Sequence, residues 1–273
     1  MQTTTVKKKI LITGSTDGIG LETAKMLVAQ GHHVLLHGRN STKLKDLEHT
    51  FAEMGGSVES YVADLSLMAN VEAFANAVTQ KHNELDVLIN NAGVYNAQNP
   101  VTQDGLDIRF AVNAIAPYLL TQRLLPLLGK SGRVINLSSA AQSSVNLRAL
   151  AGQVRLSDGE AYAQSKLALT AWSRTLAQSL KNKGPAIIAV NPGSLLGSKM
   201  VKQAFGIAGS DIRIGAEVLY RATLADEFSA ASGKYFDNDK RQFASPHPDA
   251  LNSQKSEDLM RTIEQILQEK IIH

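Results

Sequence analysis

The sequence predicts an α/β protein with one doubly wound parallel sheet of about seven strands and helices on both faces. Short apolar runs of four to six residues, rich in Val, Ile and Leu, recur along the chain and suit strands that are buried on both faces. They alternate with longer stretches of helical spacing, and right-handed crossovers then place helices on both sides of the sheet. No linker, low-complexity segment or long repeat interrupts the 273 residues, so we expect one domain over residues 1–273.

The expected elements follow this alternation in order. Strands are expected at residues 10–13, 33–37, 57–62, 87–90, 134–137 and 186–190, with a further short strand at 234–236. The first helix carries an apolar face from Leu21 to Val28 and ends at Gly31. A later helix covers 160–180, and a last one is expected near 256–268 after a polar loop. Residues 194–212 mix apolar side chains with glycine, which is typical of a mobile flap.

Composition limits the partners and the chemistry. The chain carries 28 basic and 25 acidic residues, a net charge of +3, and beyond residues 7–9 the basic residues are dispersed. A sequence pI of about 9.0 would alone suggest nucleic acid, but without a basic groove we expect no nucleic-acid partner. The absence of cysteine excludes disulfides, thiolate metal sites and a cysteine nucleophile. The seven histidines show no metal-binding spacing, so no metal site is predicted.

No segment is typical of export or of membrane insertion. Residues 1–9 place no apolar stretch after their positive charges, and no run approaches the roughly 18 apolar residues of a spanning helix. We therefore expect no membrane span and a cytoplasmic location.

A glycine-rich turn directly follows the first strand and opens the first helix. Gly14, Gly18 and Gly20 have the spacing G-x-x-x-G-x-G. Glycines in this place let the backbone turn tightly and approach a pyrophosphate, whose charge the helix N-terminus favours. The loop therefore predicts dinucleotide binding, with an ordinary glycine turn between a strand and a helix as the alternative.

The end of the second strand bears on the choice between NADP and NAD. An acidic residue there would bind a ribose 2′-hydroxyl, but the strand runs into Gly38-Arg39-Asn40, with Arg39 19 residues after Gly20. A guanidinium can pair with a 2′-phosphate, and a surface arginine at a helix start is the alternative. Asp17 argues the other way, because its charge would lie near the same phosphate. NADP(H) is favoured, and NAD(H) stays open.

Polar side chains gather at the expected carboxyl edge of the sheet. Tyr162 and Lys166 lie four residues apart in the 160–180 helix and so share one face. Ser138 and Ser139 end the fifth strand, and Asn-Asn-Ala-Gly at 90–93 ends the fourth at the same edge. Open α/β sheets bind their ligands at this edge, which makes these side chains candidates for a reactive site.

Taken in order, these motifs resemble those of the short-chain dehydrogenase/reductase family. The set is TGSTDGIG at 13–20, Asp64-Leu65, NNAG at 90–93, Asn113, Ser139, YAQSK at 162–166 and Asn191-Pro192-Gly193. The resemblance covers about residues 8–200, and the whole set is far more specific than any one motif in it. The chain is most similar to the retinol-dehydrogenase-like and protochlorophyllide-reductase-like branch, because of Gly38-Arg39-Asn40 and the 23-residue interval from Ser139 to Tyr162. That interval implies an inserted loop at 143–158 near the mouth of the active site.

The resemblance implies a Rossmann-type fold and an NAD(P)(H)-dependent oxidoreductase. The glycines of the loop would line the pyrophosphate, Asp64 and Leu65 would contact the adenine, and residues 91–93 would support the adenosine side. The implied cofactor-binding set is Gly14, Ser15, Thr16, Gly18, Ile19, Gly20, Arg39, Asn40, Asp64, Leu65, Asn91, Ala92, Gly93, Tyr162, Lys166, Pro192, Gly193 and Leu195.

The resemblance also implies four catalytic residues. Tyr162 would protonate the carbonyl oxygen during reduction, or act as the base in the reverse direction. Lys166 would lower the pKa of Tyr162 and bind the nicotinamide ribose. Ser139 would stabilise the substrate oxygen, and Asn113 would hold a water in a proton relay. The alternatives are a serine that caps a turn and an asparagine on a solvated helix face.

The flap departs from the family pattern. Many members carry a threonine four residues after the glycine of the Pro-Gly pair, where it bonds the nicotinamide carboxamide. Here that place is Gly197, and Ser198 next to it either replaces the contact or leaves it missing. An apolar face would be formed by Leu195, Leu196, Met200, Val201 and Phe205. It favours a hydrophobic carbonyl or alcohol substrate, and packing on the core is the alternative.

The resemblance further suggests a homodimer or homotetramer, through the Ala-rich face of the Tyr162 helix. The enzyme hypothesis competes with a non-catalytic dinucleotide sensor or scaffold on the same fold, and with a methyltransferase on a similar sheet. A sensor does not need all four catalytic candidates together. A methyltransferase explains neither the Tyr-x-x-x-Lys helix nor Arg39, so the sequence favours an oxidoreductase.

Overall fold

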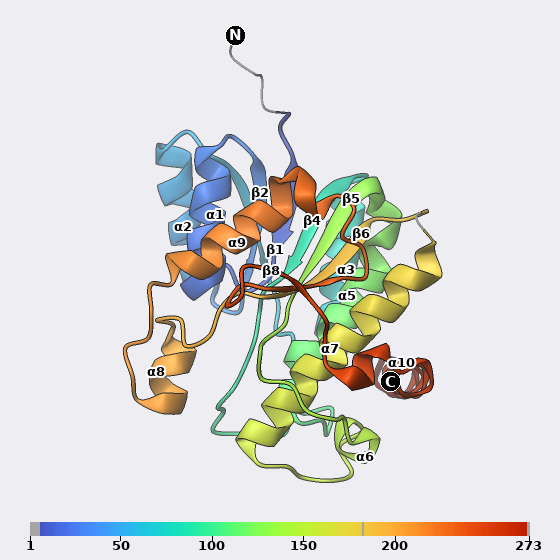
Figure 1. Ribbon diagram of the computed structural model, residues 1–273. Helices are drawn as coiled ribbons and strands as arrows, with labels where there is room; N and C mark the ends of the chain where they lie inside the picture. Colours follow the sequence, from blue (N-terminus) through green and yellow to red (C-terminus); the bar gives the residue numbers. More distant parts are fainter. Residues whose placement is uncertain (1–5, 182, 272–273) are drawn as a thin grey trace.

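A computed structural model describes residues 6–181 and 183–271, in which the strands form one sheet of order β3-β2-β1-β4-β5-β6-β7-β8 (Figure 1). The strands are β1 (Lys9–Ile12), β2 (His33–Gly38), β3 (Ser57–Val62), β4 (Leu85–Asn90), β5 (Leu128–Leu137), β6 (Ala186–Asn191), β7 (Tyr235–Asp237) and β8 (Gln242–Ala244). The pairings from β3 through to β7 are parallel, and β8 is antiparallel to β7. The predicted α/β fold with a mostly parallel sheet is confirmed, with eight strands in these residues where about seven were expected.

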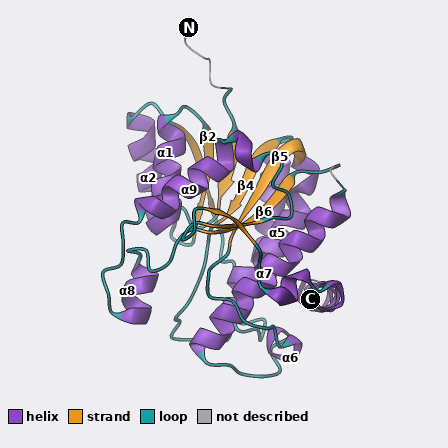
Figure 2. Cartoon of the chain, in the orientation of Figure 1, coloured by secondary structure: helices purple, strands orange, loops and turns teal. Residues whose placement is uncertain are grey.

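Helices cover both faces of the sheet (Figure 2). One layer contains α1 (Gly18–Ala29), α2 (Ser41–Glu53) and α9 (Arg213–Leu224), and the other contains α3 (Met68–Lys81), α5 (Ala116–Leu124), α7 (Asp158–Leu180) and α10 (Ser253–Ile271). The shorter helices are α4 (Ile108–Phe110), α6 (Leu147–Leu150) and α8 (Lys199–Phe205). A π-helical turn covers Ala111–Ile115, and 3₁₀ turns cover Leu125–Leu127, Asp226–Phe228 and Pro248–Leu251.

Alternate side chains of the central strands fill two separate cores. In β1, Ile10 and Ile12 pack with α1 and α9, while Leu11 packs with α3, α5 and α7. All three side chains are fully buried, and each stabilises the fold by about 1.5–3 kcal/mol. Burial on both faces explains why these strands are continuous apolar runs in the sequence.

The largest differences from the sequence-based expectation concern β8, β5 and the last helix. β8 lies where a polar loop was expected, because a three-residue edge strand that starts at the exposed Gln242 carries no apolar run. β5 begins at Leu128, whereas the sequence indicated a start at residue 134. The first part of the strand was missed because Gly129 and Gly132 interrupt its apolar pattern. The last helix runs over Ser253–Ile271, beyond the expected 256–268.

The inserted segment 143–158 packs beside α7. It contains α6, which Asn146 caps by accepting hydrogen bonds from the backbone N–H groups of Arg148 and Ala149. Ser144, Val145 and Leu147 line a second cavity of about 150 Å³ with α7 and α10. Both ends of the segment meet the first turns of α7, since the Ser143 N–H donates a hydrogen bond to the Ala163 carbonyl and Asp158 begins the helix.

The C-terminal helix α10 lies against α7 (Figure 1). Its side chains Leu259, Ile263 and Ile266 are buried in the core that α3, α5 and α7 share. Tyr118 of α5 also donates a hydrogen bond to Glu264, at 2.8 Å. The helix α10 of the same chain therefore covers part of α7, whose Ala-rich face was expected to form the contact between subunits. A homodimer or homotetramer stays a prediction.

Two features would change the class of the protein, namely a membrane-spanning helix and a metal site. No helix within residues 6–181 and 183–271 combines the length and the apolar character needed to cross a membrane. In the same ranges, no three His, Asp or Glu side chains lie where they could together hold a metal ion.

Replacing Ile263 by alanine tests the docking of α10. The side chain is fully buried, so we expect the free energy of unfolding to fall by about 2–5 kcal/mol through lost contact and a residual cavity. Urea unfolding measures this change. Arg261→Ala, a largely exposed position on the same helix, is the control and should stay within about 0.5 kcal/mol of the parent. Equal, small effects of both changes would show that α10 contributes little to the core.

Candidate active site

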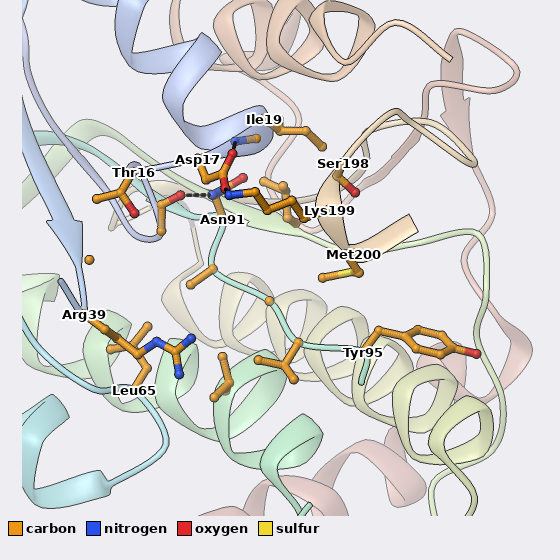
Figure 3. A pocket seen from close by; sticks show the side chains of 18 of the residues that line it. Thr16, Asp17, Ile19, Arg39, Leu65, Asn91, Tyr95, Ser198, Lys199 and Met200 are labelled. Carbon is orange, nitrogen blue, oxygen red and sulfur yellow. Dashed lines mark hydrogen bonds and ion pairs between the residues drawn. The ribbon is translucent and has the colours of Figure 1, made fainter. Parts of the chain in front are cut away.

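A cavity of about 440 Å³ opens at the carboxyl edge of the sheet, where β1 and β4 are neighbours. The strand order reverses here, because β2 and β3 continue on one side and β5 and β6 on the other. Doubly wound sheets bind ligands at such a switch point. Figure 3 shows the cavity extending from Arg39 and Leu65 at one end to Met200 and Tyr95 at the other.

Thr13 and Asn91 join the two loops that meet at the switch point. The Thr13 hydroxyl oxygen accepts hydrogen bonds from the backbone N–H groups of Asn91 (3.0 Å) and Ala92 (3.1 Å). The Asn91 amide nitrogen donates to the carbonyls of Thr13 (2.9 Å) and Gly14 (3.0 Å). A Cβ at Gly20 would collide with this amide, which explains the third glycine of the motif. Asn91 therefore shapes the glycine loop with both of its amide protons.

The glycine loop brings the N-terminus of α1 to the cavity. Asp17 caps α1 by accepting a hydrogen bond from the Gly18 N–H at 2.8 Å. Gly14 and Gly18 have φ values of +66° and +61°, which favour glycine, and a Cβ at Gly14 would lie 2.9 Å from the Cα of Ala92. Gly18 and Ile19 line the cavity, so the positive end of the helix faces the place expected for a pyrophosphate.

His37, at the end of β2, is a cavity residue that sequence reasoning missed. Its Nδ1 accepts a hydrogen bond from the Gly14 N–H at 3.1 Å. Burial lowers the pKa of His37 to about 4, so the imidazole is neutral at neutral pH. A single histidine at a strand end has no spacing or partner in the sequence that would predict this contact.

Arg39 lies two residues further, at one end of the cavity, and is exposed. Leu65 lies beside it, and Asp64 accepts a hydrogen bond from the backbone N–H of Ser66 at 2.9 Å (Figure 3). Asn40 caps α2 by accepting from the Lys43 N–H at 2.9 Å and does not line the cavity. The end of β2 therefore presents one cation to the cavity, which suits a 2′-phosphate.

Asp17 forms an ion pair with Lys199 of α8 (Figure 3). The hydrogen bond from Lys199 lowers the pKa of Asp17. The charge of Asp17 had argued against NADP(H) from the sequence. Lys199 offsets this charge and at the same time joins the flap to the glycine loop.

Tyr162 and Ser139 meet at the start of α7. Burial raises the pKa of Tyr162, and a hydrogen bond with Ser139 acts in the opposite direction. The ring of Tyr95 packs against that of Tyr162, with the centroids 4.8 Å apart, and Tyr95 raises the pKa of Tyr162 further. The phenol is therefore protonated at neutral pH, with its hydroxyl beside the hydroxyl of Ser139.

Lys166 is buried, with 4% of its surface exposed, and its Nζ donates a hydrogen bond to the Leu137 carbonyl at 2.8 Å. Burial lowers the pKa of Lys166 to about 8. Its Nζ lies 5.6 Å from the centroid of the Tyr162 ring. The lowering of the Tyr162 pKa that the resemblance implies for Lys166 stays a prediction.

Asn113 is buried in the π-helical turn that precedes α5. Its Oδ1 accepts from the Val94 N–H (2.8 Å), and its Nδ2 donates to the Val94 carbonyl (2.9 Å) and to Ser165 (3.0 Å). The side chain therefore fixes the loop after β4. Pro117 has no N–H to donate to the Asn113 carbonyl, which accounts for the irregular turn. That carbonyl is the better candidate for holding a relay water.

Arg109 is a second residue that the sequence did not reveal. It is buried in α4 and donates to the Asp107 carboxylate from Nε (2.8 Å) and Nη2 (2.6 Å). Its Nη1 donates to the Tyr95 carbonyl at 3.3 Å and to Asp158. Arg109 thereby connects the loop that carries Tyr95 to the first turn of the helix that carries Tyr162.

Asp239, in the turn after β7, fixes the loop that follows β6. Its carboxylate accepts from the Ser194 N–H (2.8 Å), the Ser194 hydroxyl (2.6 Å) and the Asn191 amide (2.9 Å). Burial alone would raise the pKa of Asp239, but these hydrogen bonds outweigh it and lower the pKa. Pro192 of this loop lines the cavity. The acceptor comes from the C-terminal part of the chain, beyond the motifs that marked the site.

The flap expected at 194–212 contains α8 and is tied together at its base. The Gly197 N–H donates to the Ser210 carbonyl (2.6 Å), and the Ser210 N–H donates to the Leu195 carbonyl (2.8 Å). Leu195 has a φ of +52°, a rare conformation for a side chain of this kind. Ser198 caps α8 and lines the cavity, whereas Gly197 does not line it.

The apolar residues of the flap divide between the cavity and the core. Met200 lines the cavity, whereas Leu196 is buried against Gly215 and Leu195 is exposed. Val201 is half-buried, and the side chain of Phe205 lies outside the described residues. Packing on the core accounts for Leu196, Met200 is the residue of this face that lines the cavity, and a hydrophobic substrate stays a prediction.

Most of the predicted cofactor-binding residues line one cavity. These are Gly14, Thr16, Gly18, Ile19, Arg39, Asp64, Leu65, Asn91, Ala92, Gly93, Tyr162, Lys166 and Pro192. The other predicted residues do not line it, namely Ser15, Gly20, Asn40, Asn113, Ser139, Gly193 and Leu195. Ser15 is fully buried because its hydroxyl bonds to the backbone of His37. Trp172, expected to pack rather than to stack on a ligand, is fully buried against Tyr118.

Comparison with known proteins gives the family. The family model described as short chain dehydrogenase matches residues 8–206. The chain belongs to the short-chain dehydrogenase family. Human retinol dehydrogenase 12 is 33% identical over 267 residues, covering 92% of this chain and 84% of that protein, so the predicted retinol-dehydrogenase-like branch is confirmed.

Two solved structures share the fold. An uncharacterized protein from Mycobacterium Paratuberculosis has a TM-score of 0.81 and 27% identity, with 96% of this chain and 93% of that chain covered. A metagenomic short-chain oxidoreductase in complex with NADP has a TM-score of 0.61 and 31% identity, with 81% and 92% covered. With the family, these likenesses make this protein an NAD(P)-dependent oxidoreductase that acts on CH–OH or C=O groups, as the sequence predicted.

Asp239→Asn tests the support of the loop at 192–194. Asparagine has one acceptor oxygen, so its amide group takes the place of either Oδ1, which accepts from the Ser194 N–H, or Oδ2, which accepts from the Ser194 hydroxyl and the Asn191 amide. At least one of the three hydrogen bonds is therefore lost. We expect turnover of a screened aldehyde or ketone to fall by about ten- to a hundred-fold, since small misplacements at a reacting centre have effects of this size. Hydrogen exchange at the Ser194 N–H should accelerate. Lys240→Ala, at a largely exposed neighbour, should behave like the parent, and normal turnover of Asp239→Asn would refute the role.

Proposed function

We propose that the protein is an NADPH-preferring reductase of an apolar aldehyde or ketone, or the dehydrogenase of the corresponding alcohol. The proposal rests chiefly on one arrangement. Tyr162, hydrogen-bonded to Ser139, lines the same cavity whose far end carries the exposed Arg39. A proton donor for a carbonyl and a cation for a 2′-phosphate therefore belong to one binding space.

The residues at the switch point fit a dinucleotide. Gly14 and Gly20 leave no room for a Cβ because the loop after β4 packs against them, and this packing shapes the turn at the N-terminus of α1. The positive end of that helix suits the phosphates of a dinucleotide. Arg39 would hold the 2′-phosphate, and Lys166 would bind the nicotinamide ribose. Ser198 would bond the carboxamide. When bound, NADPH supplies the hydride, while the protein supplies orientation and proton transfer.

Tyr162 is suited to act as an acid. Burial keeps its phenol protonated at neutral pH, so it can give a proton to the oxygen of a carbonyl as negative charge develops there. The hydroxyl of Ser139 lies beside it and would donate a hydrogen bond to the same oxygen. Lys166 is a cation below about pH 8 and would replace the proton through a water that accepts from its ammonium, with the Asn113 carbonyl holding that water in place.

The cavity favours an apolar substrate. Val94, Tyr95, Val112 and Met200 line it near Tyr162. One relative is named retinol dehydrogenase 12, and retinol is an apolar alcohol, which agrees with the apolar lining of the cavity. We therefore propose a hydrophobic carbonyl or alcohol as the small-molecule partner. The expected cytoplasmic location stays a prediction.

Tyr162→Phe tests the proton donor. The change keeps the ring and removes the hydroxyl, so we expect turnover to fall by about 10²–10⁴-fold. Affinity for NADPH should stay within a few-fold, because Arg39 and the glycine loop are untouched. The measurements are NADPH oxidation with a panel of apolar aldehydes and ketones, and equilibrium titration of the dinucleotide. Tyr61→Phe, in β3, is the control for losing a tyrosine hydroxyl elsewhere. Retained turnover in Tyr162→Phe would eliminate Tyr162 as the donor.

Arg39→Ala tests the preference for NADPH. Loss of a charge-assisted hydrogen bond should weaken NADPH binding by about 1.5–3 kcal/mol and leave NADH binding nearly unchanged. Titrating the parent and the variant with both dinucleotides measures the difference. Arg148→Ala, at an exposed arginine of α6, controls for the change in net charge. Equal losses for NADPH and NADH, or none for either, would place the 2′-phosphate elsewhere.

A further inference from the structure

We propose that His37 is a positioning residue for the dinucleotide, whose imidazole holds the first turn of the glycine loop through the Gly14 N–H. The inference rests on the proposed function, because it assumes that this cavity binds NADP(H). His37 is the next-to-last residue of β2, has 2% of its surface exposed and lines the cavity next to the loop that it supports.

Its hydrogen bonds define one protonation state. Nε2 lies 3.2 Å from the Ala63 carbonyl oxygen, and Nδ1 lies 3.1 Å from the Gly14 nitrogen. A carbonyl can only accept, so Nε2 carries the proton. An amide N–H can only donate, so Nδ1 carries none. Only the neutral Nε2–H tautomer satisfies both neighbours, and a doubly protonated ring would set an N–H against the N–H of Gly14.

The ring has little freedom to move. It stacks on Phe74, with the centroids 4.7 Å apart and the planes 23° from parallel. The backbone of His37 is bonded to the same loop, since the Ser15 N–H donates to the His37 carbonyl and the His37 N–H donates to the Ser15 hydroxyl, each at 2.9 Å. Gly14 and Ser15 are therefore both held by one residue of β2.

This support is independent of the 2′-phosphate. The contact ends on Gly14, whose φ of +66° sets the turn that a pyrophosphate would approach. Arg39 lies two residues later, is exposed and lines the same cavity, where it would meet the 2′-phosphate and not the pyrophosphate. Loss of the His37 contact should therefore weaken NADPH and NADH equally, whereas loss of Arg39 should weaken NADPH alone.

Two isosteric replacements separate the two ring nitrogens. The Oδ1 of asparagine can take the place of Nδ1 and accept from Gly14, whereas the amide of glutamine can reach the place of Nε2 and donate to Ala63. The variants His37→Asn, His37→Gln and His37→Leu are titrated with NADPH and with NADH, and their thermal unfolding is recorded. We expect His37→Asn to bind both dinucleotides within about three-fold of the parent, and the other two to bind both about ten- to a hundred-fold more weakly.

The outcomes distinguish the inference from the proposed function. Parent protein that binds neither dinucleotide would refute the proposed function itself. If the parent binds, parent-like affinity in His37→Gln and His37→Leu would overturn the role of His37. So would equal losses in His37→Asn and His37→Gln at similar unfolding temperatures, because a merely structural role does not depend on which nitrogen is replaced. A loss confined to NADPH would also overturn it.

Discussion

The hydrogen bonds between Thr13 and Asn91 hold together the place on which the site depends. Where the strand order reverses, the loops after β1 and β4 diverge, and their backbone polar groups lose the partners that a continuing sheet would supply. Two side chains replace those partners, with four hydrogen bonds of 2.9–3.1 Å. The glycines follow from this arrangement, because Gly14 and Gly20 lie too close to the second loop for any side chain. The motif therefore records packing between two loops as well as contact with a ligand.

Burial decides the charge states in the site. His37 is neutral, Tyr162 is protonated, and the pKa of Lys166 is lowered to about 8. Each of these pKa shifts has the same cause, because a charged group loses the stabilisation of water when it is buried. For Lys166, burial is the cause of the lowered pKa. A dinucleotide brings negative charge to this space. That negative charge would help to keep Lys166 protonated, although its proposed contact is with the nicotinamide ribose.

The parts of the fold that the sequence predicted are those with a local pattern. The central strands are continuous apolar runs because both faces are buried, and the glycine loop and the Tyr162–Lys166 helix have fixed spacings. β8 has no such pattern, since three residues at a sheet edge bury little. His37 and Asp239 could not be predicted because their importance arises from contacts across the fold, 23 residues away at Gly14 and 45 residues away at Ser194. The hydrogen bonds from the Asn113 side chain to Val94 and Ser165 could not be predicted for the same reason. The π-helical turn that contains Asn113 could have been expected from Pro117.

The two ends of the cavity are built by different means. At the end of Arg39, loops are fixed to buried strands by Thr13, Asn91 and His37. At the other end the cover is a flap whose base is closed by the backbone hydrogen bonds of Gly197 and Ser210 and whose tip bonds to Asp17 through Lys199. Leu195 adopts its rare φ within that base. Changes within α8 can therefore alter the substrate end of the cavity and leave intact the hydrogen bonds that shape the dinucleotide end.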